Sequence, residues 1–256
     1  GRVAMEAATT AYNCVAVGTR AMDACQTGGY NTAIGDGALS AYTGSESTAC
    51  GAEALANCTT GADNTAVGVN ALKQTTTGYQ CTAVGDDTLR ENTTGNSNTA
   101  IGAKSLDTNT TGSQNTAVGR EVLQTLVQGE KNVAIGNYNF YKATGSYNTG
   151  IGYAVGYEVT TGQNNTFLGH KAGRSSAPSG NVTTGSNIVC LGDNSVSDLY
   201  CADTSISSSD SRDKTDITDF TKGLDWIKAL RPVTYRWDRR TWYATDEEPY
   251  GTPDGS

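Results

Sequence analysis

Asn64-Thr65-Ala66-Val67-Gly68-Val69-Asn70-Ala71-Leu72 is the clearest copy of a pattern that recurs along most of this chain, and a Thr-Thr-Gly turn at 76–78 completes it. The glycine at its centre, here called the anchor glycine, returns after 17 residues seven times and after 16 residues twice. One more copy follows a 23-residue gap. A fixed short period indicates a stack of similar structural units. The anchor glycines are Gly18, Gly35, Gly51, Gly68, Gly85, Gly102, Gly119, Gly136, Gly152, Gly169 and Gly192.

Fixed residue types around the anchor glycine predict the shape of one unit. The residue directly before it is apolar or Cys in all eleven copies. The residue two before is Ala, and the residue four after is large and apolar, in the first eight copies. Turn-forming residues lie between these positions. Because about 17 residues cannot hold two packed helices, we predict an all-β solenoid or β-roll rod over residues 1–202. Each coil would hold two or three short strands and rise ~4.8 Å.

Adjacent apolar residues recur in pairs, as in Ala66-Val67 and Ala71-Leu72. Neighbours on a strand point to opposite faces, so burial of both members would give the coil two apolar faces. A single thin coil encloses only one of them. Either the alanines simply tolerate exposure, or the second face is covered by another chain. We prefer the second interpretation, an obligate oligomer, with a homotrimeric rod as its natural closed form.

An asparagine recurs four residues before the anchor glycine. Such a column predicts a ladder of side-chain amides, each bonded to the next coil. It is equally typical of a corner residue that tolerates unusual backbone angles, and the two interpretations are compatible. The column comprises Asn31, Asn64, Asn98, Asn115, Asn132, Asn148 and Asn165.

The amino-acid composition argues against several classes of partner and cofactor. The formal charge of −8 argues against nucleic acid and anionic membranes. No apolar run reaches the ~18 residues of a membrane span, so we expect no membrane insertion. The single histidine and the absence of Cys-x-x-Cys spacing predict no metal site and no cofactor.

The seven cysteines are predicted to be mostly free thiols. Cys14 and Cys81 share a column four coils apart, which places them ~19 Å apart, beyond the reach of a disulfide. The same argument separates Cys25 from Cys58. Cys190 with Cys201 remains an open pair.

Five tyrosines gather where the repeat becomes less regular, from residue 138 to residue 157. Exposed tyrosines beside polar side chains can bind sugars, and this is one interpretation of the cluster. The alternatives are that they fill widened coils or form a subunit contact. The candidate glycan-binding residues are Tyr138, Tyr141, Tyr147, Tyr153 and Tyr157.

Residues 203–256 differ in composition and are predicted to be a second domain. All three tryptophans lie there, together with a concentration of charge. Apolar residues at helical spacing run over 220–230, and Pro232 would end that helix. Large apolar residues alternate with polar residues over 233–237, a pattern typical of a strand.

A polar run ahead of that helix holds the pair Ser209-Asp210, and Lys214 follows at short distance. Gly-Leu-Asp at 223–225 and Leu-Arg-Pro-Val-Thr-Tyr at 230–235 come next. In order and spacing, residues 207–238 resemble the C-terminal intramolecular chaperone domain of endosialidase-type phage tailspikes and tail fibres. The upstream repeats resemble those of phage fibres and, more loosely, of trimeric adhesin heads.

This resemblance implies a trimerising domain that assists folding of the rod and then cuts itself off. In that family the Ser of the Ser-Asp pair acts with a Lys five residues on, which corresponds here to Ser209 and Lys214, with Asp210 as the paired acid. A Ser hydroxyl needs a base to take its proton, and burial can lower the pKa of a lysine enough for that role. Attack on the Ser208 carbonyl through a five-membered ring favours cleavage of the Ser208–Ser209 bond, while the resemblance leaves open on which side of the Ser the cut falls.

Together these features predict a homotrimeric structural component of a phage-like tail fibre or spike, located in the virion. Its only chemistry would be one round of self-cleavage. One alternative is a spike that binds or cleaves a host glycan or other receptor. Glycan hydrolysis needs two neighbouring carboxylates, yet the aspartates form no recurring column. The other alternative is a bacterial trimeric adhesin head, which should lack the Ser-Asp and Leu-Arg-Pro-Val segments.

Overall fold

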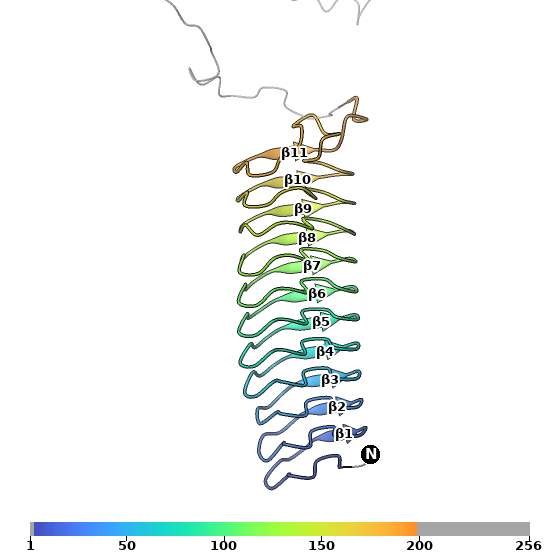
Figure 1. The fold of residues 1–256 in the computed structure, drawn as a ribbon, viewed down its shortest axis with the longest axis vertical. Coiled ribbons are helices and arrows are strands. Elements are labelled where there is room, and N and C mark those ends of the chain that lie inside the picture. The colour runs from blue at the N-terminus through green and yellow to red at the C-terminus, as the bar shows by residue number, and fades with distance from the viewer. Residues whose placement is uncertain (1–2, 199–256) are drawn as a thin grey trace, which may run out of the picture. The chain divides into compact units, whose positions relative to one another are not determined.

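A computed structural model describes residues 3–198, which form one parallel β-solenoid (Figure 1). Consecutive coils contribute neighbouring strands to one sheet, in chain order and in register, so that Ala66 pairs with Ala83. No helix occurs among the described residues, and the predicted solenoid with coils of about 17 residues is confirmed. The strands are β1 (Val15–Val17), β2 (Thr32–Ile34), β3 (Thr48–Cys50), β4 (Thr65–Val67), β5 (Thr82–Val84), β6 (Thr99–Ile101), β7 (Thr116–Val118), β8 (Val133–Ile135), β9 (Thr149–Ile151), β10 (Thr166–Leu168) and β11 (Val189–Leu191).

Each coil has one strand of three residues, so the prediction of two or three strands per coil was wrong. The rest of the coil turns through left-handed corners, as at Asp63, Asn70 and Leu72 in one coil, with φ of 57°, 56° and 54°. Backbone hydrogen bonds between coils continue through these corners; Leu72 N–H donates to the Thr88 carbonyl over 3.0 Å. Main-chain groups are therefore paired without regular strand geometry.

Two apolar columns differ in side-chain shape because their backbones differ. The column four residues after the anchor glycine is left-handed in the first eight copies and holds Met, Leu or Phe, never Val or Ile. A left-handed backbone is especially unfavourable for β-branched side chains. The column directly before the anchor glycine lies in a strand, where β-branched residues fit well, and is mostly Val and Ile.

The anchor glycines are required by crowding between coils. Gly68 has a φ of +135°, and a Cβ added to it would lie 2.3 Å from the carbonyl oxygen of Gly85. An L side chain is disfavoured at this φ and has no space there. Consecutive coils therefore pack glycine against glycine at this corner.

The interior is narrow and filled mainly by alanine and leucine. Ala66 is fully buried, whereas Val67 on the opposite side of the strand is 37% exposed. Ala71 and Leu72 are both fully buried. The expectation that this second pair points to opposite faces was wrong, because Leu72 lies in a left-handed corner rather than in a strand. The suggestion that alanine is the exposed member was also wrong, since Val67 takes that place.

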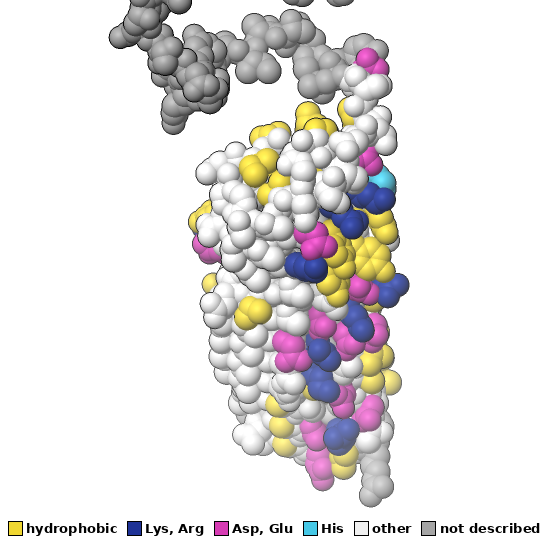
Figure 2. Space-filling view, turned by 45° about the horizontal axis from the view of Figure 1, so that its top comes forward, with side chains coloured by type: hydrophobic (Ala, Val, Ile, Leu, Met, Phe, Trp, Pro, Cys, Tyr) yellow, Lys and Arg dark blue, Asp and Glu magenta, His cyan; other side chains and the backbone are white. Residues whose placement is uncertain are grey.

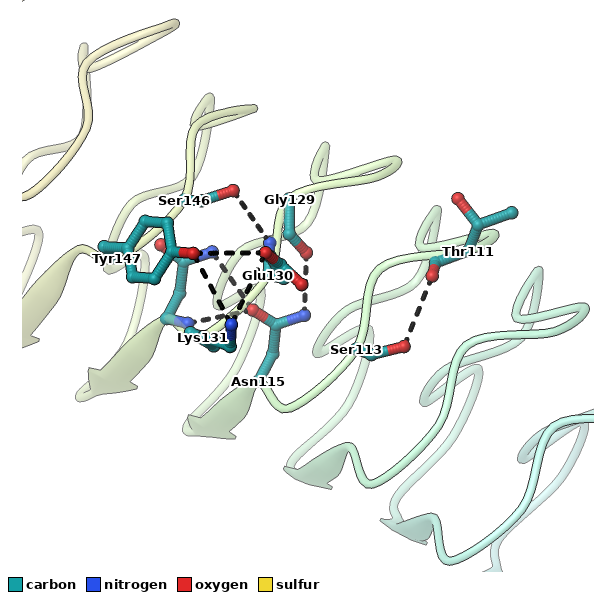
Figure 3. Close-up of polar contacts among 9 residues, drawn as sticks. Thr111, Ser113, Asn115, Gly129, Glu130, Lys131, Ser146 and Tyr147 are labelled. Atoms are coloured by element: carbon teal, nitrogen blue, oxygen red, sulfur yellow. Dashed lines mark hydrogen bonds and ion pairs between the residues drawn. The ribbon is translucent and has the colours of Figure 1, made fainter.

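The asparagine column forms a buried ladder between coils (Figure 3). The Asn115 side-chain oxygen accepts the Asn132 backbone N–H over 3.0 Å, and its Nδ2 donates to the Gly129 carbonyl over 2.9 Å. A direct amide contact also joins Asn132 Nδ2 to Asn115 Oδ1 at 3.0 Å. The left-handed corner lies one residue earlier, at Gln114 with a φ of 61°. The ladder prediction is therefore confirmed, and the corner interpretation was wrong.

Six cysteines lie in the described part of the chain, and no disulfide joins any two of them. Cys58 and Cys81 are buried in the coil interior. Burial raises the pKa of the Cys58 thiol to about 12 and that of Cys81 to about 11. These thiols act as small core residues. Cys190 is buried, and its suggested partner Cys201 lies outside the described residues.

Candidate functional site

Four of the five predicted tyrosines meet on one surface of the coils that contain β8 and β9. Tyr138 contacts Tyr153 edge-on with ring centroids 6.1 Å apart, and Tyr141 stacks on Tyr157 at 4.9 Å with an interplanar angle of 5°. Tyr138 and Tyr141 are 6.4 Å apart and join the two pairs. We call these four residues the tyrosine surface. Figure 2 shows hydrophobic side chains and basic residues side by side below the cyan histidine.

The repeat explains why these rings meet. Tyr141 and Tyr157 each lie five residues after an anchor glycine, so they occupy the same position in consecutive coils. Coils of a parallel sheet are ~4.8 Å apart, which matches the 4.9 Å between the stacked rings. The interior of these coils is filled by Phe140 and Phe167, whose rings lie 5.8 Å apart. The interpretation that the tyrosines fill widened coils was therefore wrong.

Tyr147 lies apart from the tyrosine surface. It precedes its anchor glycine by five residues and has a left-handed backbone, with a φ of 62°. Lys131 Nζ is 5.2 Å from the centre of its ring, and its hydroxyl lies 3.3 Å from Glu130 Oε1 (Figure 3). Four of the predicted residues thus come together, and the fifth belongs to another corner of the coil.

Basic side chains surround the tyrosine surface. The Arg120 guanidinium is 5.9 Å from the Tyr138 ring centre, and that of Arg174 is 5.1 Å from the Tyr157 ring centre. Lys142 Nζ is 5.5 Å from the centre of the Tyr157 ring. These distances are typical of cation–π contacts. Sequence reasoning missed the three basic residues, although Arg174 occupies the same coil position as Tyr141 and Tyr157.

The basic residues differ in how far they are neutralised. Lys142 pairs with Glu158 at 2.7 Å, a hydrogen bond that raises the pKa of the lysine. Arg120 pairs with Glu121 at 2.7 Å. Arg174 makes no ion pair within residues 3–198. Its guanidinium donors are therefore the group best placed to bind an added ligand.

A histidine extends the surface by one more coil. His170 stacks on Tyr153 with ring centres 5.8 Å apart, and its Nδ1 is 2.8 Å from Asp193 Oδ2. That hydrogen bond lowers the pKa of the Asp193 carboxyl. Beside these rings lies an open hollow of about 340 Å³, lined by Tyr138, Tyr153, Ala154, Tyr157 and Arg174. Aromatic faces, and a guanidinium without an ion pair among residues 3–198, suit the apolar face and the hydroxyl groups of a sugar.

A second hollow, of about 250 Å³, differs in chemistry. Its lining includes Arg20, Glu53 and Lys73 and no aromatic ring, and Lys73 forms an ion pair with Glu53. Arg20 pairs with Asp36 at 3.4 Å, outside the lining, so each of these charges already has a partner. Within residues 3–198 there is also no cluster of three or more His, Cys, Asp or Glu side chains that could hold a metal ion. The same part of the chain contains no helix with the length and hydrophobicity of a membrane crossing.

The predicted self-cleavage residues Ser208, Ser209, Asp210 and Lys214 lie outside the described residues, as does the helix predicted over 220–230. Their assignment therefore depends on sequence. Residues 209–252 match the family model for the chaperone of endosialidase. This match begins at Ser209 and includes the Leu-Arg-Pro-Val-Thr-Tyr segment.

The chaperone match and the solenoid together fit a tailspike-type or endosialidase-type protein with a C-terminal chaperone domain, and the resemblance inferred from sequence is confirmed. Comparison with curated proteins and with solved structures found no match to the chain.

Proposed function

We propose that this chain forms the homotrimeric shaft of a phage-like tail fibre or spike and is located in the virion. A C-terminal chaperone at residues 203–256 would assist its folding into the trimer. The observation that carries the proposal is the chaperone match at 209–252, which follows an eleven-strand solenoid in the same chain. A bacterial adhesin head, the alternative, is not expected to carry such a segment.

The repeat itself explains why such a rod needs assistance. Ten of the eleven strands begin with Thr or Val and have Ala, Gly or Phe in the middle, so adjacent coils offer nearly identical pairing partners. A chain displaced by one coil against its neighbours would bury almost the same groups. Long-range pairing of this kind folds slowly and leaves strand edges exposed. A terminal domain that brings three chain ends together would set the register before the coils pair.

Self-cleavage would then release the chaperone. In the proposed step, Lys214 as a free amine takes the proton of the Ser209 hydroxyl, and the oxygen forms a bond to the Ser208 carbonyl carbon. The bond from that carbon to the Ser209 nitrogen breaks as the nitrogen gains a proton, which leaves an ester. Water hydrolyses the ester to a Ser208 carboxylate and restores the Ser209 hydroxyl. Asp210 would orient the lysine through its carboxylate.

Mass spectrometry of the expressed full chain tests this step. We expect one fragment that ends at Ser208 and one that begins at Ser209, and only the uncut chain in the variants Ser209→Ala and Lys214→Ala. Ser211→Ala is the matched control and should cleave normally. Unchanged cleavage in Ser209→Ala would show that the assigned dyad is wrong.

A second candidate function is recognition of a host glycan by the tyrosine surface. The specific observation in its favour is the stacked pair Tyr141 and Tyr157 beside Arg174, which has no ion pair in the described part of the chain. Binding of the full chain to a glycan array should be lost in the double variant Tyr141→Ala and Tyr157→Ala. Tyr147→Ala removes an exposed tyrosine from another corner and should bind normally. Equal binding by both variants would remove the tyrosine surface from consideration.

A further inference from the structure

The outward side of the sheet carries no charge along its whole length. In every strand the middle residue points into the coil and the first and third residues point outward. The first residues are Thr or Val, and the third are Val, Ile, Leu or Cys. At the chain average of 17% charged residues, about four of these 22 positions would be charged. We call these 22 positions the outer sheet face.

The third positions form a continuous apolar ridge in the isolated chain. Val17 is 54% exposed, Ile101 41%, Ile151 45% and Leu191 41%, so the ridge extends from the first strand to the last. Eleven strands at ~4.8 Å give the ridge a length of roughly 50 Å. The outer sheet face that carries it is three residues, or roughly 10 Å, wide. Apolar surfaces of this size on soluble proteins mark contact sites.

The spacing of the ridge restricts what can cover it. Apolar side chains repeat once per coil, so a partner that contacts all the coils must present apolar groups at the same interval. A second copy of this chain, parallel and in register, has that interval by construction. Because the outer sheet face carries no charge, its burial does not incur the cost of an unpaired buried charge. A narrow, flat ribbon of this kind can close around a threefold axis.

We propose that the outer sheet faces of three copies of this chain meet, parallel and in register, along a common axis and form the dry interior of the trimer. This inference rests on the proposed trimeric function and adds the surface through which the chains meet. It assigns the tyrosine surface and the charged corners to the outside of the rod, where a host ligand could reach them.

A native cysteine gives a direct probe of this arrangement. Cys50 is the third residue of β3, lies on the ridge between Ile34 and Val67, and is half-exposed in the single chain. Three copies in register would bring three Cys50 side chains together at the axis. A shift of one coil would instead place Cys50 opposite Ile34 or Val67.

The experiment uses the full chain with Cys14→Ser and Cys201→Ser, so that the ridge cysteine is the main reactive thiol. Mild oxidation followed by non-reducing denaturing electrophoresis should give a covalent dimer plus monomer, since only two of three thiols can pair. Adding Cys50→Ser should abolish the dimer. A native trimer, seen by light scattering, whose oxidation gives only monomer would overturn the inference.

A pair of charge substitutions provides an independent measurement. Val67→Asp with Ile101→Asp places charges on the ridge, and we expect light scattering to show loss of the trimer with the β-type circular dichroism retained. Thr77→Asp with Thr111→Asp adds the same charges to exposed turns of the same two coils and should leave a trimer. A trimer in both variants overturns the proposed face. A monomeric wild-type chain would instead contradict the trimeric function itself.

Discussion

The two faces of each strand have opposite environments within one chain. On the inner face, Ala66 is fully buried against its own coil, whereas Val67 on the outer face remains 37% exposed. The larger and more apolar residue is therefore the one that the single chain leaves in water. In a self-sufficient solenoid we would expect the reverse, because burial of a valine stabilises more than burial of an alanine. The inner face explains how one chain folds, and the outer face indicates what it assembles with.

Substitution of an anchor glycine should have the largest effect on the inner side of this comparison. Gly68→Ala places a Cβ against the Gly85 carbonyl at a φ of +135°, and we expect a loss of roughly 3 kcal/mol or more in unfolding free energy. Gly180→Ala is the control, because nothing lies within 4 Å of its added Cβ, and should cost about 1 kcal/mol. Urea denaturation measures both. Similar losses in the two variants would contradict the crowding argument.

Truncation of an inner and an outer side chain compares the two faces directly. Leu89→Ala removes a fully buried side chain from the narrow interior and should cost ~2–4 kcal/mol in thermal unfolding. Val67→Ala on the ridge should cost less than ~1 kcal/mol when the chain is a monomer. In the assembled protein the cost of Val67→Ala should rise with the extent of its burial. Equal costs in monomer and assembly would argue that Val67 is not at the contact.

Removal of one rung of the asparagine ladder should have a smaller effect than the loss of the leucine. Asn115→Ala leaves the buried Asn132 N–H and the Gly129 carbonyl without their partners, and we expect a loss of ~1–3 kcal/mol. Asn57→Ala, which breaks an exposed amide contact to Gln74, is the control and should change stability by less than ~0.5 kcal/mol. Hydrogen exchange at Asn132 N–H should accelerate in the first variant alone.

Alkaline pH should lower the free energy of unfolding through groups buried on the inner face, not through the outer sheet face. The folded-state pKa of Cys58 is about 12 and that of Cys81 about 11, above their ordinary value of 9.0. The unfolded chain therefore releases these protons first, so stability is fully present below pH 9 and is lost as the pH rises toward 11 and 12. The slope would reach up to ~1.4 kcal/mol per pH unit for each thiol.

The control for this prediction is the double variant Cys58→Ala and Cys81→Asn. The second substitution supplies the asparagine that the ladder lacks in that coil. The pair should remove the part of the alkaline dependence that comes from these two thiols, while Cys25 and Tyr42, whose pKa burial also raises, keep their part. Thermal melts at pH 8, 9 and 10 measure it. An identical slope in wild type and variant would assign the alkaline effect to other groups.

Particular residues show which features of the fold and of the chaperone segment can be predicted from the sequence. The repeat around the anchor glycines predicts the period, the short strands and the asparagine ladder, because each depends only on contacts between equivalent positions in neighbouring coils. The segment from Ser209 predicts the chaperone family, because its motifs are local. The column four residues after the anchor glycine also carried a signal that was overlooked: large side chains without a branch at Cβ, repeated at one position, indicate a left-handed corner.

The path of the chain between strands was decided by tertiary structure. Whether Leu72 points inward with Ala71, and whether Tyr147 joins the other four tyrosines, depends on how many left-handed corners each coil contains and where they lie. Residue type restricts which side chains a left-handed corner accepts, but hydrogen bonds from the next coil hold each corner in place. The sequence alone therefore determines the repeat and its pairing, and only the folded stack determines which side chains share a surface.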